Sequence, residues 1–311
     1  MKDNLKTRWP LVLAELVSRR LSVLAICVAL VACAQPDPGV SKAELRNTPL
    51  EDCCDNAESF PQPLVHLAGP LAPVIGRFIG SVVMRDGYIA RPAAYREVEA
   101  QLRPLDVLFV RSNGRLSSRM LPGFFSHAVI YLGSEAELTA LGVWDDPTLK
   151  PYQSAIRAGR TYIESSTPDV HLSKTETVLA TDAVAILRPP IKTRARKREA
   201  LRDLARRIGS DFDFRFDTAS KDKLFCAELA AQAMPEAGLP TRHLYGRQTI
   251  LPDDVVALAV TGRGNMGFVG YVRGTKTGWN ISDRKTLIVD MKSDWRATRP
   301  DPNRLEARNR H

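Results

Sequence analysis

The amino-acid sequence predicts an α+β domain on the strength of three observations. Short runs rich in β-branched and aromatic residues predict strands at residues 106–110, 128–132 and 183–188. An amphipathic run over residues 193–208, with alanine, leucine and isoleucine along one side, predicts a helix. A second helix is predicted where Cys226 opens an alanine-rich apolar run. A chain of 311 residues is long enough to bury a full hydrophobic core around these elements.

The same patterns place the other elements of this domain along the chain. They predict, in order, an amphipathic helix over 93–102, a strand over 160–168, a short helix or turn over 254–260, and strands over 267–272 and 286–291. Glu164 lies near the end of the strand over 160–168. Gly209 follows the 193–208 helix, where a glycine commonly ends a helix.

Composition and charge narrow the class of protein. The chain is 44% hydrophobic and 25% charged, which is typical of a soluble globular protein. Its net charge is +9, but the basic residues are interleaved with acids and form no basic and aromatic pattern of a nucleic-acid module. Five cysteines in a chain of this length do not predict a disulfide framework. We therefore expect no nucleic-acid partner, and only a mild attraction to anionic surfaces.

The N-terminal segment has the pattern of a secretory signal. Five basic residues lie within the first 20 residues, and an apolar run over residues 21–31 follows them. Small residues end this run at Ala32 and Cys33. The run is shorter than the ~20 apolar residues that a helix needs to span a bilayer. The pattern therefore predicts export of the chain.

The run over 30–33, Leu-Val-Ala-Cys, resembles the bacterial lipoprotein box. This resemblance implies a signal peptide over 1–32, cleavage before Cys33 and lipidation of the Cys33 thiol. The lipid would anchor the protein to a membrane, which is therefore a predicted partner. Ala34 follows the cysteine in place of aspartate. By resemblance to Gram-negative sorting, this implies a periplasm-facing lipoprotein of the cell envelope, at the outer membrane. The alternatives are an uncleaved anchor and an ordinary signal peptide followed by an incidental cysteine.

Composition divides the exported chain into three parts. Residues 33–63 are rich in Pro, Asp, Asn and Ser and predict a flexible tether. The folded domain is predicted over 64–291, and the polar, Pro- and Arg-rich segment 292–311 predicts a disordered basic tail. Cys53 and Cys54 lie in the tether, and no second ligand pair follows them at zinc spacing. The sequence predicts no metal site and no cofactor.

Two side chains of the domain suit nucleophilic chemistry. Cys226 opens a predicted helix, and the unpaired N–H groups of a helix start favour a thiolate. The alternative is a cysteine that only packs in the core. His127 lies at the start of a predicted strand and is the type of side chain that best removes a proton near neutral pH. A structural histidine is the alternative there. His171 is a second candidate for an orienting group.

Several sequence blocks between residues 100 and 275 carry a resemblance to a known family. In chain order they are Leu105-Asp-Val-Leu-Phe-Val-Arg111, Phe125-Ser-His-Ala-Val-Ile-Tyr-Leu-Gly133, Tyr162-Ile-Glu-Ser, the segment 209–216, Phe225-Cys-Ala-Glu-Leu229 and Leu251-Pro-Asp-Asp254. They resemble the blocks of the YiiX/YebB-like cysteine hydrolases, the circularly permuted, papain-like branch of the NlpC superfamily. The resemblance implies a permuted papain-like fold, with an antiparallel sheet packed against helices and the nucleophile at a helix N-terminus.

The resemblance also implies a role for each site residue. Papain-like enzymes place the cysteine before the histidine, whereas here the histidine comes first; roles and not sequence order define such a site. Cys226 would be the nucleophile and His127 the general base and later the acid. Glu164 would hold the imidazole and stabilise its charged form. The backbone N–H of Cys226 would donate to the oxyanion.

The chain departs from the family pattern at two positions beside the nucleophile. Phe212 precedes Asp213 where the family commonly has tyrosine, and Ala227 follows Cys226 where the family often has serine. Glu228 keeps the family residue. From these departures we expect either altered specificity or lost activity. Asp213 itself is expected to form a turn.

The sequence therefore predicts an envelope-anchored cysteine hydrolase, an amidase, a peptidase or an acyl-transferring enzyme with a thioester on Cys226. Its substrate would be a wall peptide, another amide such as an isopeptide, or an acyl lipid; no substrate-binding residue is predicted. One alternative is a non-catalytic envelope lipoprotein that binds a ligand and keeps the fold. Another is a metal or redox protein that uses Cys53, Cys54 and Cys226.

Overall fold

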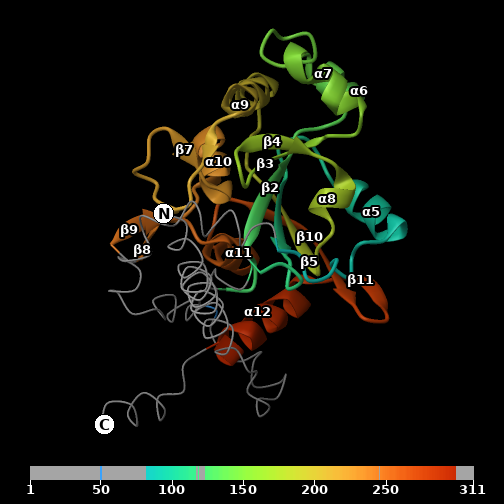
Figure 1. Ribbon diagram of the computed structural model, residues 1–311, viewed down its shortest axis with the longest axis vertical. Helices are drawn as coiled ribbons and strands as arrows, with labels where there is room; N and C mark the ends of the chain where they lie inside the picture. Colours follow the sequence, from blue (N-terminus) through green and yellow to red (C-terminus); the bar gives the residue numbers. More distant parts are fainter. Residues whose placement is uncertain (1–49, 51–81, 117, 119–122, 245, 299–311) are drawn as a thin grey trace, which may run out of the picture.

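The computed structural model describes Leu50, residues 82–116, Ser118, residues 123–244 and residues 246–298 (Figure 1). The predicted signal peptide, the predicted lipidation site Cys33 and the tether apart from Leu50 lie outside the described residues. Within the described part of the chain, no helix is long and apolar enough to cross a membrane.

The domain is built on one seven-stranded sheet with the strand order β11-β10-β5-β1-β2-β3-β4. The strands are β1 (Val107–Arg111), β2 (His127–Tyr131), β3 (Tyr162–Ser165), β4 (Val170–Ser173), β5 (Ala183–Arg188), β10 (Gly267–Thr275) and β11 (Gly278–Ser282). Every pair of neighbouring strands runs antiparallel. Two small sheets lie outside it: β6 (Asp211–Phe212) with β7 (Lys223–Leu224), and the hairpin of β8 (Arg242–Leu244) with β9 (Arg247–Thr249).

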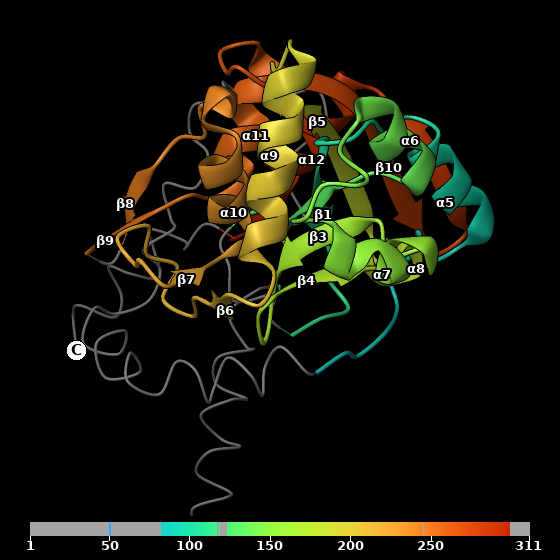
Figure 2. The ribbon, with the colours of Figure 1, turned by 90° about the horizontal axis from the view of Figure 1, so that it is seen from above.

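Helices connect the strands and cover both faces of the sheet. They are α5 (Pro92–Glu99), α6 (Glu135–Leu141), α7 (Gln153–Arg157), α8 (Thr175–Val178), α9 (Arg194–Arg207), α10 (Cys226–Ala233), α11 (Pro252–Thr261) and α12 (Arg284–Thr298). Figure 2 shows α9, α10 and α11 on one side of the sheet and α5 and α8 on the other. The fold is therefore α+β, as the sequence predicts.

Side chains of the central strands alternate between two buried cores. Val107 and Phe109 of β1 pack in one cluster with residues of α9, α10, α11 and α12. Leu108 and Val110 point to the opposite cluster, which includes residues of α5 and α8. A strand that is buried on both faces has a continuous run of apolar residues. This run is why β1 and β5 could be predicted from the sequence.

The prediction of a strand over residues 286–291 is wrong. They lie inside helix α12, whose buried residues Leu287, Met291 and Trp295 recur at every fourth position. This is the spacing of one helix face, and it outweighs the strand preference of the β-branched residues there. The predicted boundary between domain and tail at residue 291 therefore falls within a helix that continues to Thr298.

We expect Ile186→Ala to lower the free energy of unfolding by about 2–5 kcal/mol, as large-to-small core changes do. Ile186 lies in β5, between β10 and β1, and is fully buried. Ile281→Ala on β11 is the matched control, since Ile281 is 53% exposed and should change stability by less than about 0.5 kcal/mol. Urea unfolding checks both variants. Equal losses would contradict this account of the core.

Candidate active site

Cys226 is the first residue of helix α10 and is buried. Phe225 precedes it in an extended conformation (φ −106°, ψ 168°), so the helix begins at the cysteine. Glu228 lies in the first turn of the helix, and its Oε1 accepts a hydrogen bond from Nε2 of Gln232 at 2.8 Å. Helix α10 packs against β2 and β3. The thiol of Cys226 therefore lies at a helix N-terminus, and this helix packs against β2, the strand that begins at His127.

His127 and Glu164 come together because β2 and β3 pair in antiparallel register. The pairing of Ile130 with Ile163 places the beginning of β2 beside the end of β3. His127 is the first residue of β2, and its Nε2 lies 2.7 Å from Oε2 of Glu164. The Glu164 side chain is 9% exposed and that of His127 is 23% exposed. The acid is thus enclosed, while the imidazole keeps an open side.

Strand β4 supplies a further partner for Glu164. The hydroxyl of Ser173 donates to Oε1 of Glu164, and Nε2 of His171 lies 3.8 Å from the same oxygen. Burial raises the pKa of Glu164, but the hydrogen bonds from His127 and Ser173 and the charges of His127 and His171 lower it to about 2. Glu164 is therefore a carboxylate at neutral pH, held from both sides.

Cys226 and His127 shift the pKa of each other in opposite directions. Burial lowers the pKa of His127, but the charge of Cys226, hydrogen bonds to Cys226 and Glu164 and the charge of Glu164 raise it to about 10. Burial raises the pKa of Cys226, but the charge and hydrogen bond of His127 and the backbone N–H groups of Ala128 and Ala227 lower it below its ordinary value. Both shifts favour a thiolate beside an imidazolium. Because Nε2 faces Glu164, Nδ1 is the ring nitrogen left for the thiol.

The segment before the nucleophile is held by turns and aromatic packing. Asp213 is buried and accepts hydrogen bonds from the backbone N–H groups of Arg215 and Asp217, so it forms a turn. The ring of Phe212 packs edge-on against Phe214 and Phe216. A phenylalanine at position 212 thus fits an apolar cluster in which its ring has packing partners.

Sequence reasoning missed Ser173, which contacts Glu164. The strand that carries it, β4, was not predicted, although Val170 and Leu172 alternate with polar residues there. His171, the alternative orienting group, does lie near Glu164, but its Nδ1 approaches the backbone oxygen and carboxylate of Asp169. The nearer contact of Glu164 is therefore His127.

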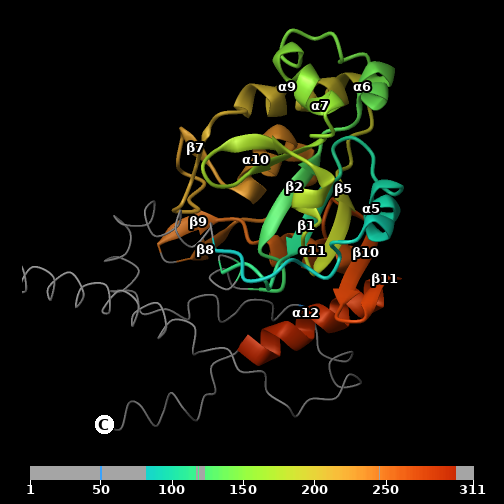
Figure 3. The same ribbon diagram turned by 45° about the vertical axis from the view of Figure 1, so that its right-hand side comes forward.

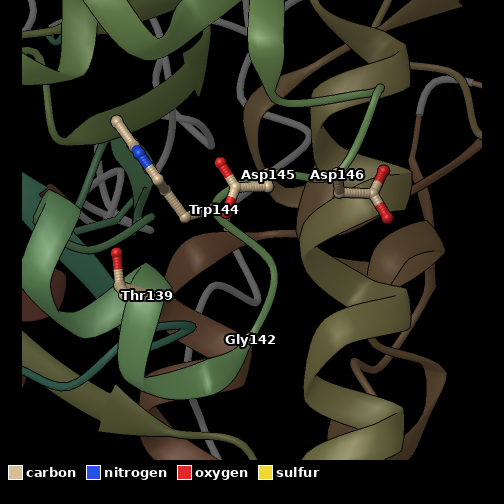
Figure 4. A pocket seen from close by; sticks show the side chains of 5 residues that line it. All are labelled: Thr139, Gly142, Trp144, Asp145 and Asp146. Atoms are coloured by element: carbon tan, nitrogen blue, oxygen red, sulfur yellow. The ribbon is translucent and has the colours of Figure 1, made fainter.

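A surface hollow lies elsewhere, between the end of α6 and α9 (Figure 4). Its volume is about 180 Å³, and its lining is Thr139, Gly142, Trp144, Asp145 and Asp146. None of the predicted site residues lines it. Asp146 is bound by Arg202 of α9 at 2.5 Å, so this carboxylate already holds a structural contact. Among the residues that the structure covers, no group of three or more His, Cys, Asp or Glu side chains is placed to hold a metal ion.

The strand that begins at His127 precedes the helix that begins at Cys226 in this α+β fold, which is the order expected of a permuted papain-like hydrolase. The family model of the permuted papain-like amidase enzymes, the YaeF/YiiX or C92 family, matches residues 101–277, and the chain belongs to this family. The protein is thus an amidase- or peptidase-like enzyme, and the predicted family is confirmed. No curated protein and no solved structure matches the chain. The matched region ends before α12 begins.

Proposed function

We propose that the protein is a cysteine hydrolase of the cell envelope that acts through Cys226, His127 and Glu164. One observation carries the proposal. The imidazole of His127 binds Glu164 through Nε2 and interacts with the thiol of Cys226, which lowers the pKa of the thiol and raises that of the imidazole. In an ion pair of this kind the thiolate is the activated nucleophile, and the imidazolium is already protonated to act as the acid. Packing alone would not need it.

The proposed reaction runs in two halves through a thioester. The sulfur of Cys226 attacks the substrate carbonyl carbon and forms a C–S bond, while the carbonyl electron pair moves to oxygen. The backbone N–H of Cys226 donates to this oxyanion. When the oxyanion collapses, the C–N bond breaks and the imidazolium of His127 gives its proton to the leaving nitrogen.

The second half restores the enzyme. Neutral His127 takes a proton from water, and the water oxygen attacks the thioester carbonyl. The C–S bond then breaks, and the thiolate of Cys226 leaves with the electron pair while the proton stays on His127. Glu164 keeps the ring orientation through both halves. If another nucleophile takes the place of water, the same steps transfer the acyl group.

The envelope location and the class of substrate are proposed from the sequence. The lipoprotein box over 30–33 supports an anchor on Cys33. The apolar residues over 121–125, directly before the histidine strand, favour an acyl or lipid-like substrate, while a tethered enzyme also fits a wall peptide.

Metabolic labelling with palmitate tests the anchor. We expect the full chain to incorporate the label and the variant Cys33→Ser to lose it. Equal labelling of that variant would contradict the anchor.

Trapping of the acyl-enzyme tests the proposed chemistry before the natural substrate is known. We expect the purified protein to react with p-nitrophenyl acetate and, after acid quenching, to carry an acetyl thioester on the peptide that contains Cys226. Neutral hydroxylamine should remove this group. Acetylation confined to lysines, in the folded protein, would instead support the non-catalytic binding protein.

A further inference from the structure

The chain that leads into His127 is fixed by a single buried carboxylate. The backbone N–H of Phe124 donates to Oδ2 of Asp253 at 2.6 Å, and that of Phe125 donates to Oδ1 at 2.7 Å. Gly123 has a φ of +109°, and a Cβ there would lie 2.6 Å from Oδ2 of Asp253. Only glycine allows so close an approach. Two successive backbone groups, two and three residues before His127, are thus bound to one side chain.

Asp253 lies in the first turn of α11 and is completely buried. Its Oδ2 also accepts a hydrogen bond from Nε1 of Trp295 at 2.5 Å. Burial raises the pKa of Asp253 and the three N–H groups of Phe125, Phe124 and Trp295 lower it, with a net pKa of about 7. A buried acid costs several kcal/mol unless hydrogen bonds compensate it. A neutral apolar side chain would fill the space at lower cost but would bind none of these groups.

Helix α12 is linked to the same chain segment a second time, through Arg111 of β1. Arg111 donates to the carbonyl oxygen of Phe124 at 3.2 Å, and its guanidinium lies 4.2 Å from the centre of the Phe124 ring. Asp294 of α12 binds Arg111 at 2.7 Å. Figure 3 shows α12 at the end of the domain, beneath α11. Asp294 through Arg111, and Trp295 through Asp253, thus connect α12 indirectly to the segment that enters β2.

We propose that Asp253 and Trp295 are positioning residues for His127, and that α12, outside the family-matched region, is part of the active site. The proposal rests on the proposed role of His127 as the base. The peptide groups of Phe124 and Phe125 are bound to Asp253, and Ser126 continues the sheet by donating to Val110 at 3.0 Å. Little freedom is left between these bonds and the imidazole. A misplacement of about 1 Å at a reacting group costs on the order of 10²-fold in rate.

Asp253→Asn tests the proposal, because the amide keeps the size of the side chain but turns one oxygen into a donor against backbone N–H groups. The readouts are the rate of Cys226 alkylation by iodoacetamide near neutral pH, kcat and KM for p-nitrophenyl acetate, and Tm. We expect alkylation to fall about 10-fold and kcat about 10²-fold, with KM nearly unchanged. Asp254→Asn is the matched control: Asp254 is the next residue of α11 and binds Arg242 at 2.8 Å. It should leave alkylation and kcat as they are.

Trp295→Phe keeps an aromatic ring in the buried place but removes the N–H together with part of the indole ring. It tests the proposal independently if Asp253→Asn does not fold. It should lower kcat in the same direction by a smaller factor and leave KM unchanged. A lowered Tm with unchanged alkylation and kcat, in either variant that folds, would mean that these residues only stabilise the fold.

His127→Ala, measured in parallel, separates this result from failure of the proposed function. If His127→Ala slows alkylation and the Asp253 and Trp295 variants do not, the positioning role alone is wrong. If His127→Ala also leaves alkylation unchanged, the proposed function and the positioning role both fail.

Discussion

Cys226→Ala is expected to abolish hydrolysis of p-nitrophenyl acetate, with kcat/KM reduced by about 10⁴-fold or more, as loss of a nucleophile does. The reason is that, in the proposed mechanism, the sulfur of Cys226 is the nucleophile, and the charge and hydrogen bond of His127 lower its pKa. Release of p-nitrophenolate in the presence of equal concentrations of the two proteins measures the effect. The side chain is buried, so circular dichroism and Tm must show that the variant is folded.

The control for Cys226→Ala is the double variant Cys53→Ser/Cys54→Ser. These two cysteines lie outside the described residues, and the proposed reaction does not use them. Their replacement should leave hydrolysis unchanged. The opposite pattern, full activity in Cys226→Ala and none in the double variant, would favour the metal or redox protein and reject the hydrolase.

His127→Ala is expected to lower kcat by about 10²–10⁴-fold near neutral pH, the usual contribution of a positioned acid and base. The wild-type rate should fall as acid protonates the thiolate of Cys226, whose pKa is lowered. With an amide substrate it should fall again as the pH rises through about 10, where the imidazolium of His127 loses the proton that the leaving nitrogen needs. The variant should lack this alkaline limb.

His243→Ala is the control for His127→Ala, since His243 is exposed and lies on β8, outside the proposed catalytic group. Its pH–rate profile should match that of the wild type. An alkaline limb that survives in His127→Ala would assign the acid to another group and would reject the role given to His127.

Much of the fold was predictable because its signals are local. The strand over 183–188 is β5 with the same bounds, and the 193–208 helix is α9 to within one residue at each end. The apolar run of that strand and the amphipathic face of that helix are each contained in the sequence segment itself. The placement of His127 at a strand start and Cys226 at a helix start was likewise a local inference, and both elements begin there.

What the sequence could not predict depends on partners far along the chain. The hydrogen bond between Ser173 and Glu164 requires the pairing of β3 with β4, and β4 has only four residues. The buried acid Asp253 could not be assigned a role, because its donors lie more than a hundred positions earlier and on α12. Helix α12 itself was predicted in part as a strand, since its burial decides its structure more than its intrinsic preference.

The pH dependence of Cys226 alkylation by iodoacetamide tests the central claim most directly, because it requires no substrate. A Cys226 thiolate paired with His127 should react at its maximal rate already at a pH well below the ordinary thiol pKa, with the label mapped to the Cys226 peptide. In His127→Ala the rate should rise only toward the ordinary thiol pKa of 9.0, and at about pH 7 it should be about 10- to 100-fold below the wild type. Two identical profiles, both rising toward the ordinary thiol pKa, would contradict an activated cysteine and with it the proposed enzyme.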